Sequence, residues 1–203
     1  MHKEILTPEQ IELLPLVKSF TKNFGLVGGT AIALHLGHRR SIDFDFFTSK
    51  DFDNLKIRNQ VLKFKKINQV LRDEKGQYTI VVNETRLTFF CYPFKINFSK
   101  SFERMCRLPD LLTLAAMKAY ALGRRAKWKD YVDLYFIIKR HYPLGSIIKK
   151  AKQIFGREFN EKIFRSQLVY FRDIDYSEKV IYLPNWQVKD QEIRKALIKF
   201  SLG

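Results

Sequence analysis

Residues 28–47 read GGTAIALHLGHRRSIDFDFF and follow a short apolar run at residues 24–27. The two glycines and the threonine predict a tight turn between a strand and a short helix, and Gly37 stands where a glycine commonly ends a helix. Residues 41–47 then alternate polar and apolar side chains, which is the pattern of a half-buried strand. The stretch therefore predicts a strand, a glycine-rich turn, a helix and a second strand, and these open a mixed α/β fold.

Two aspartates lie one residue apart in the second of these strands. Because successive side chains of a strand point to opposite faces, Asp43 and Asp45 share one face, while Phe44 and Phe46 share the other. Strand geometry separates the two carboxylates by about 6 to 7 Å, close enough to hold a pair of divalent ions roughly 4 Å apart. An isolated Asp-x-Asp more often lies on the solvent-exposed face of an amphipathic strand, so the pair alone does not establish a metal site.

The glycine turn supplies the other half of a metal and phosphate site. Gly28 and Gly29 let the backbone pass close to a ligand, Thr30 offers a hydroxyl, and a helix N-terminus presents N–H groups that suit phosphate. Glycines before a helix also occur for packing reasons, so this signal is weak by itself. The fifteen residues from Gly28 to Asp43 leave room for one helix and a loop, which would return the carboxylate strand beside the turn.

The rest of the first half continues the α/β pattern. Residues 8–23 predict a helix that Pro15 ends or kinks. Residues 51–66 predict a basic amphipathic helix, whose apolar side would carry Leu55, Val61 and Leu62. Further strands are expected at residues 67–72, 77–82 and 86–92.

The second half has helical patterns only. Helices are expected at residues 109–122, 127–140, 144–155, 159–171 and 188–201. No repeat, low-complexity tract or flexible linker separates the halves. We therefore expect an α/β core at residues 1–100 and a helical region at residues 101–203, packed on the core as one unit.

A second group of polar residues lies in the helical half. Lys118 is surrounded by apolar residues on its helix face, so it needs an anion unless its ammonium group extends to solvent. Asp130 and Asp133 are spaced i, i+3 on the next helix. Taken alone, they favour a surface helix on which Lys129 pairs with Asp133.

The charge balance points to a polyanionic partner. The chain has 37 Lys and Arg against 21 Asp and Glu, a net charge of +16, which favours nucleic acid first and an anionic membrane surface second. No single basic amphipathic segment supports the membrane alternative. The chain shows no signal-peptide core and no apolar run long enough to span a bilayer, so we expect a cytoplasmic protein. Cys91 and Cys106 are expected to be buried thiols, and the scattered histidines predict no zinc site.

Residues 28–47 and the later segment LPDLLTLAAMKAYALGRRAKWKDYVDLYF together closely resemble the AbiEii/AbiGii toxin family of nucleotidyltransferases, within the DNA polymerase β-like superfamily. The resemblance covers about residues 20–140, and the pairing of the two blocks is specific. It implies a minimal nucleotidyltransferase fold of class α+β, with a small mixed sheet flanked by helices and followed by a helical C-terminal region.

The resemblance also implies roles for individual residues. The glycine motif Gly28, Gly29 and Thr30 would hold the triphosphate of an NTP, and Asp43 and Asp45 would bind Mg²⁺ or Mn²⁺. Lys118 would contact the triphosphate, and Arg40 would be a further phosphate ligand. Asp130 matches the first acid of an Arg…Lys-Asp-x-x-Asp motif, with Asp133 as the second acid and Arg124 or Arg125 as the arginine.

One departure from the superfamily pattern concerns the third carboxylate. Relatives that act on a hydroxyl usually carry an acid on a neighbouring strand, where it binds metal and helps to activate the nucleophile. The corresponding strand here, RLTFFCYPF, has Phe89 or Phe90 where an acid is expected. The catalytic base is therefore open, with Glu84 and Asp130 as candidates.

The implied activity is Mg²⁺-dependent transfer of a nucleoside monophosphate from an NTP to an RNA hydroxyl, with tRNA favoured by the basic charge. In the family this activity is the toxin half of a toxin–antitoxin pair, so an antitoxin protein partner is implied as well. Two alternatives stay open at this point. One is a non-catalytic NTP- or RNA-binding protein on the same fold, and the other is a transferase that modifies a protein hydroxyl.

Overall fold

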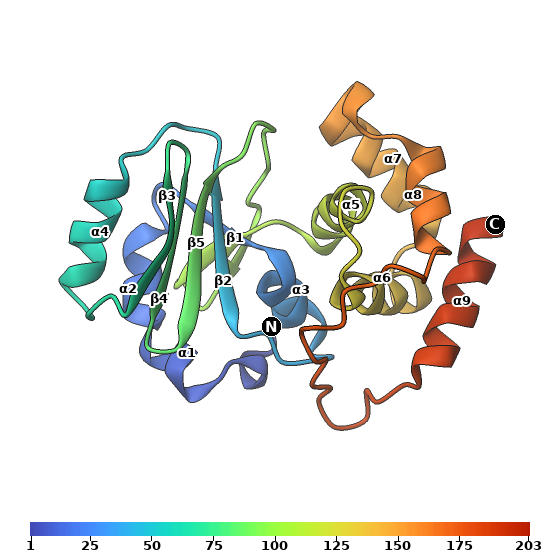
Figure 1. Ribbon diagram of the computed structural model, residues 1–203, viewed down its shortest axis with the longest axis horizontal. Helices are drawn as coiled ribbons and strands as arrows, with labels where there is room; N and C mark the ends of the chain where they lie inside the picture. Colours follow the sequence, from blue (N-terminus) through green and yellow to red (C-terminus); the bar gives the residue numbers. More distant parts are fainter. The chain divides into compact units, whose positions relative to one another are not determined.

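The computed structural model describes residues 1–203. Contacts within the chain divide it into two units, Met1–Asp110 and Leu111–Gly203. The first unit contains the β-sheet and the second is helical, as Figure 1 shows. A short hairpin of β6 (Lys100–Phe102) and β7 (Cys106–Leu108) belongs to the first unit and was not foreseen from the sequence. It places the boundary after Asp110 instead of near residue 100.

The first unit is built around a five-stranded mixed sheet with the order β1-β2-β5-β4-β3. Its strands are β1 (Gly25–Val27), β2 (Asp43–Thr48), β3 (Gln69–Glu74), β4 (Gln77–Val82) and β5 (Thr85–Cys91). Its helices are η1 (Lys3–Ile5), α1 (Pro8–Glu12), α2 (Leu14–Phe20), α3 (Gly28–Leu36) and α4 (Asn54–Leu62). Strands β2 and β5 are parallel, while every other neighbouring pair is antiparallel. The predicted mixed α/β fold is confirmed.

The phenylalanine face of β2 packs into the core, as the alternation predicted. Phe44 and Phe46 are both almost completely buried. The Phe46 ring stacks on Phe89 of β5 at 5.1 Å between centroids, and Phe20 of α2 meets Phe89 at 4.7 Å. Burying one such ring is worth about 1.5 to 3 kcal/mol. This aromatic cluster therefore fixes β2 against β5 and α2, and it leaves the aspartate face of β2 turned away from the core.

Two local predictions about helix ends are confirmed. The helix at the N-terminus is interrupted at Leu13, so α1 and α2 are separate helices, and Pro15 lies in the first turn of α2. Gly37 ends α3 with φ of 70°, a left-handed conformation that costs glycine little.

Helix α4 is shorter than predicted, and its buried side is different. Asp53 caps its N-terminus by accepting a hydrogen bond from the Leu55 N–H at 2.8 Å. The helix buries Ile57 and Val61, whereas Leu55 and Leu62 are exposed. The assignment of Leu55 and Leu62 to the apolar side was therefore wrong, because the residues that face the sheet are spaced i, i+4 from Ile57.

The second unit contains only helices and irregular connections. They are α5 (Leu111–Leu122), α6 (Trp128–Arg140), α7 (Leu144–Phe155), η2 (Gly156–Glu158), α8 (Glu161–Leu168) and α9 (Asp190–Leu202). All five predicted helices are present, with α8 ending three residues earlier than expected. No helix of the chain has the length and apolar character that crossing a membrane requires.

The two cysteines differ in burial. Cys106 is buried, and burial raises the pKa of its thiol to about 12, which makes it chemically inert at neutral pH. Cys91 is only half-buried at the end of β5. The prediction of two buried thiols is thus confirmed for Cys106 and wrong for Cys91, because β5 ends beside the exposed turn before β4.

The lowered pKa of Glu178 means that part of the free energy of unfolding is lost in acid. Burial alone would raise its pKa, but hydrogen bonds from Lys127 at 2.6 Å and Lys129 at 2.9 Å outweigh burial and lower the pKa from 4.5 to about 2. Because the unfolded chain binds the proton more tightly, this contribution is complete above about pH 5 and is lost as the pH falls toward 2.

We expect Glu178→Gln to lower the free energy of unfolding by about 1 to 2 kcal/mol at pH 7, after discounting for partial exposure. Urea unfolding at pH 7 and pH 3 should show the difference between wild type and variant shrinking at the lower pH; an equal difference at both would contradict the assignment.

Candidate functional site

The glycine turn and the carboxylate strand lie against each other. Val27, the last residue of β1, is the register partner of Asp45 on β2. The next residue, Gly28, has φ of 72°, and a Cβ atom placed on it would collide with Oδ2 of Asp45. The structure therefore brings together Gly28 and Asp45, and only glycine permits so close an approach.

Gly28→Ala is expected to be strongly unfavourable for this reason. An alanine there would take a left-handed conformation that costs about 1 to 2 kcal/mol, and its methyl group would displace the Asp45 side chain. The matched control is Gly145→Ala on α7, where an added Cβ meets nothing within 4 Å. We expect the first change to lower the chemical-denaturation midpoint and the second to leave it unchanged or raise it. Equal midpoints for the two variants would contradict the close approach.

Thr30 ties the first turn of α3 to the start of β2. Its hydroxyl donates to the backbone carbonyl of Asp43 and forms a second hydrogen bond, of 2.9 Å, with the Ser41 hydroxyl. Thr30 is almost completely buried. The hydroxyl that was predicted to help hold a triphosphate thus fixes the position of the aspartate strand, and direct contact with a nucleotide stays a prediction.

The strand beside the aspartates carries an arginine and a threonine instead of a third acid. In the parallel register of β2 and β5, Asp43 lies opposite Arg86 and Asp45 lies opposite Thr88. Arg86 forms an ion pair with Asp43. Phe89 points into the core, so it does not occupy the position of the missing acid. Phe90 is on the aspartate face but lies opposite Phe47, beyond both aspartates.

The arginine that lies beside the glycine turn is Arg39, and not the predicted Arg40. A Cβ on Gly29 would come within 2.8 Å of Nη2 of Arg39, so the Arg39 guanidinium lies against the turn. Arg39 is 1% exposed and donates a hydrogen bond of 2.9 Å to the carbonyl of Arg40. Arg40 donates to the carbonyl of Leu6 at 3.4 Å. The role of Arg40 as a phosphate ligand stays a prediction, and Arg39 is a residue that the sequence did not single out.

The carboxylate pair has the composition of a small magnesium site. Mg²⁺ is usually held by one or two carboxylates together with substrate phosphates. Asp43 and Asp45 are both half-buried on one face of β2, and the Asp45 carboxylate lies directly against Gly28, where a Cβ atom would collide with it. No group of three or more His, Cys, Asp or Glu side chains gathers anywhere in the chain. The pair therefore fits a metal that arrives with phosphate oxygens.

In the second unit, Lys118 is the centre of a buried ion network. Its Nζ lies 2.7 Å from Oδ1 of Asp130 and 3.1 Å from Oδ2 of Asp133. Lys118 is 6% exposed, and the two aspartates are almost completely buried. Asp130 and Asp133 are therefore not on a surface helix, and Lys129 pairs with Glu178. The surface interpretation is wrong because the two acids supply the anion that Lys118 needs.

The structure also distinguishes the two candidate arginines of this motif. Nε of Arg125 lies 3.2 Å from Oδ2 of Asp130, and the Arg125 side chain is 55% exposed. Arg124 instead pairs with Glu158 at 3.2 Å and stacks on the Tyr120 ring. Of the two arginines, Arg125 is the one that contacts Asp130, and it presents a cation to solvent beside the buried network; its role in the motif stays a prediction.

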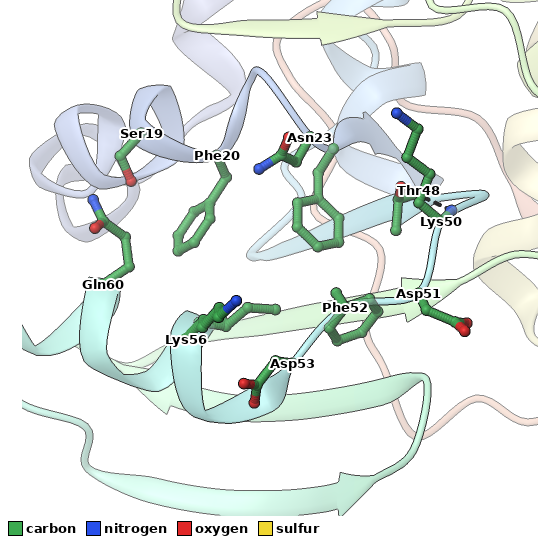
Figure 2. A pocket seen from close by; sticks show the side chains of 12 residues that line it. Ser19, Phe20, Asn23, Thr48, Lys50, Asp51, Phe52, Asp53, Lys56 and Gln60 are labelled. Atoms are coloured by element: carbon green, nitrogen blue, oxygen red, sulfur yellow. Dashed lines mark hydrogen bonds between the residues drawn. The ribbon is translucent and has the colours of Figure 1, made fainter.

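A pocket of about 450 Å³ lies elsewhere in the first unit, between α2, the end of β2 and α4. Figure 2 shows its phenylalanine rings facing one another, with polar side chains around them. The two acids on its rim do not point toward one another. Asp53 caps α4, and Asp51 points away from the pocket. No candidate site residue lines this pocket, so it is separate from the carboxylate pair.

The sequence matches a protein-family model and a curated protein. Residues 16–99 match the family described as nucleotidyl transferase AbiEii toxin, type IV toxin–antitoxin system. A protein of Aquifex aeolicus, aq_aa25, is 30% identical over 202 residues, which cover 96% of this chain and 97% of that protein. The matched family region includes the glycine turn, both aspartates and strand β5.

Solved structures resemble the fold at low sequence identity. JHP933 from Helicobacter pylori has a TM-score of 0.62 at 16% identity, covering 96% of this chain and 89% of its own. MenT4, a nucleotidyltransferase toxin from Mycobacterium tuberculosis, has a TM-score of 0.57 at 14% identity, covering 96% of this chain and 82% of its own. At these identities the likeness establishes the fold.

Proposed function

The chain belongs to the AbiEii family of nucleotidyltransferase toxins, and from this premise we propose that it transfers a nucleoside monophosphate from an NTP to a hydroxyl group of RNA. The reaction breaks the bond between the α- and β-phosphates and forms a bond from the α-phosphate to the acceptor oxygen. Pyrophosphate leaves, and the acceptor proton passes to solvent. The net charge of +16 favours RNA, and in particular tRNA, as the acceptor.

A single observation carries the proposal: the α3 N-terminus lies directly beside Asp45 on the strand that also carries Asp43. A helix N-terminus attracts phosphate, and paired carboxylates attract the metal that accompanies a triphosphate. Val27, at the N-cap of α3, has no polar side chain to occupy the helix end. This arrangement supports the proposal of an NTP site at this point of the first unit.

Asp43 and Asp45 would hold Mg²⁺ or Mn²⁺. When bound, such a metal neutralises the charge that develops on the phosphates during transfer. The turn from Gly28 to Thr30 would bind the triphosphate through backbone N–H groups, with the buried Arg39 adding positive charge behind it. Arg86 orients the Asp43 carboxylate through their ion pair.

No side chain is assigned as a strong general base. Thr88 and Arg86 stand where a third carboxylate would lie on β5, and Glu84 is exposed in the turn before that strand. Phosphoryl transfer depends mainly on positioning and charge neutralisation, so a site without a strong base can still turn over. In the second unit, we propose that Asp130 orients the acceptor hydroxyl and that Arg125, which it binds, contacts phosphate. Lys118 would hold Asp130 and Asp133 in place through its ion pairs with them, and its contact with the triphosphate stays a prediction.

The test is a set of labelling reactions with purified protein, Mg²⁺, total tRNA and each α-labelled NTP in turn. Wild type should label tRNA with at least one NTP, and the Asp43→Ala/Asp45→Ala variant should label nothing. Label on protein instead of RNA would favour the alternative acceptor, a Tyr or Ser hydroxyl. If neither wild type nor variant labels anything while wild type still binds NTP, the chain is a nucleotide-binding protein and the proposed reaction is wrong.

A toxin role in the cytoplasm completes the proposal, since NTPs and tRNA are found there. The family description names a toxin–antitoxin system, which supports an antitoxin as a genetic partner. Induced expression of the wild-type chain should arrest growth, and expression of the Asp43→Ala/Asp45→Ala variant should not. Growth arrest by the Asp43→Ala/Asp45→Ala variant would separate toxicity from nucleotidyl transfer.

A further inference from the structure

We infer that the outer edge of β3 and the exposed side of α4 form a docking surface for an acidic segment of another protein, which joins the sheet as an extended strand. The inference is independent of the proposed chemistry. Strand β3 ends the sheet and bonds only to β4, and all six of its residues are exposed. Figure 1 shows it beside α4 at the end of the sheet. Such an edge presents unpaired N–H and C=O groups, which can pair with an added strand.

Apolar side chains accompany this open edge. The eighteen residues from 54 to 71 include five large hydrophobic side chains that are at least 42% exposed: Leu55, Leu62, Phe64, Val70 and Leu71. A groove of about 290 Å³ runs between α4 and the start of β3, and Leu62 and Val70 are among its lining residues. Several exposed apolar residues beside an unpaired strand are typical of an interaction site.

The open part of the edge is its first half. At the other end, Nδ2 of Asn54 donates to the Asp73 carboxylate at 2.6 Å and to the carbonyl of Glu74 at 3.0 Å. The strand register shifts between Val70 and Arg72. An added strand would therefore pair along Gln69–Leu71, and its apolar side chains would enter the groove beside Leu62.

The charge of this surface selects the partner. Residues 54–72 contain no acid and six cations, namely Lys56, Arg58, Lys63, Lys65, Lys66 and Arg72. Only Lys65 and Arg72 take part in salt bridges, with Glu12 and Glu74.

A second copy of the chain would bring the same cations to the interface and be repelled. RNA would neutralise the cations, but it would leave the aliphatic side chains without base-stacking partners, because Phe64 is the one aromatic residue among them. A protein segment that alternates acidic and apolar residues satisfies both features.

The test is selection of a phage-displayed library of twelve-residue peptides on the full-length protein, followed by affinity measurements on the enriched peptides. We expect alternating acidic and apolar peptides, whose affinity falls at high salt. The Val70→Thr/Leu71→Ser variant keeps the charge and should weaken peptide binding at least tenfold. The matched control is Ile181→Thr, another exposed apolar residue in the second unit, and it should change nothing. Thermal unfolding of each variant confirms that it is folded.

Three results would overturn the inference. Enriched peptides that are not acidic would remove the charge argument. Binding that survives the Val70→Thr/Leu71→Ser change in a folded variant would place the peptide elsewhere. Displacement of the peptide by a twelve-nucleotide RNA that binds wild type and variant equally well would assign the surface to RNA.

Discussion

Asp45→Asn is expected to reduce nucleotidyl transfer at least a hundredfold while the protein stays folded. The substitution keeps the size of the side chain and removes the charge that would hold a metal, and removing one preorganised electrostatic group commonly costs about 10² to 10³ in rate. Asp45 is half-buried on a strand that the phenylalanine cluster holds in place, so the fold should survive the substitution, which thermal unfolding checks. Initial rates of label incorporation measure the effect.

Two further variants make this prediction sharper. Asp190→Asn also removes one acid, from the exposed first turn of α9, and should leave the rate unchanged. Glu84→Gln tests the open question of the base, because Glu84 is the acid that precedes strand β5. A rate for Asp45→Asn within a few-fold of wild type would remove Asp45 from the reaction. A loss for Glu84→Gln as large as that for Asp45→Asn would supply the missing third acid.

Lys118→Met is expected to be the most destabilising single change in the second unit. It would leave two almost fully buried aspartates, 2.7 and 3.1 Å from the removed ammonium group, without that cation. Removing one partner of a buried ion network typically costs about 3 to 5 kcal/mol, because the remaining buried charges lose the main group that compensates them. Urea unfolding at neutral pH should show the loss.

A compensating variant distinguishes charge from packing. Lys118→Met/Asp133→Asn removes one acid along with the cation, and Arg125 still contacts Asp130. We expect this double variant to recover at least half of the lost free energy. A double variant as unstable as Lys118→Met would mean that the methylene packing of Lys118, and not its charge, stabilises the helices.

Local signals predicted the first part of the fold well. The strand, turn, helix and strand from residue 24 to residue 48 follow from alternation and glycine placement, which act over a few residues. The same alternation placed Asp43 and Asp45 on the face opposite Phe44 and Phe46, as the structure has them. Helix α4 was harder, because which of its sides is buried depends on the sheet beneath it.

The partners of the aspartates could not be predicted from local pattern. Arg86 meets Asp43 only through the parallel register of β2 and β5, and a shift of one residue would have turned Arg86 to the other face. The buried network around Lys118 has the same origin, since its two anions come from another helix. The sequence indicated that Lys118 needed an anion, but spacing along one helix cannot show which residues of a second helix supply it.

The most direct test of the central claim compares one NTP labelled at two positions. The preferred NTP, labelled either at the α- or at the γ-phosphate, is incubated with wild-type protein, Mg²⁺ and tRNA. The account predicts that label from the α-phosphate enters tRNA and that label from the γ-phosphate is recovered in pyrophosphate. Transfer of the γ-label to the acceptor, or release of both labels without any transfer, would contradict it.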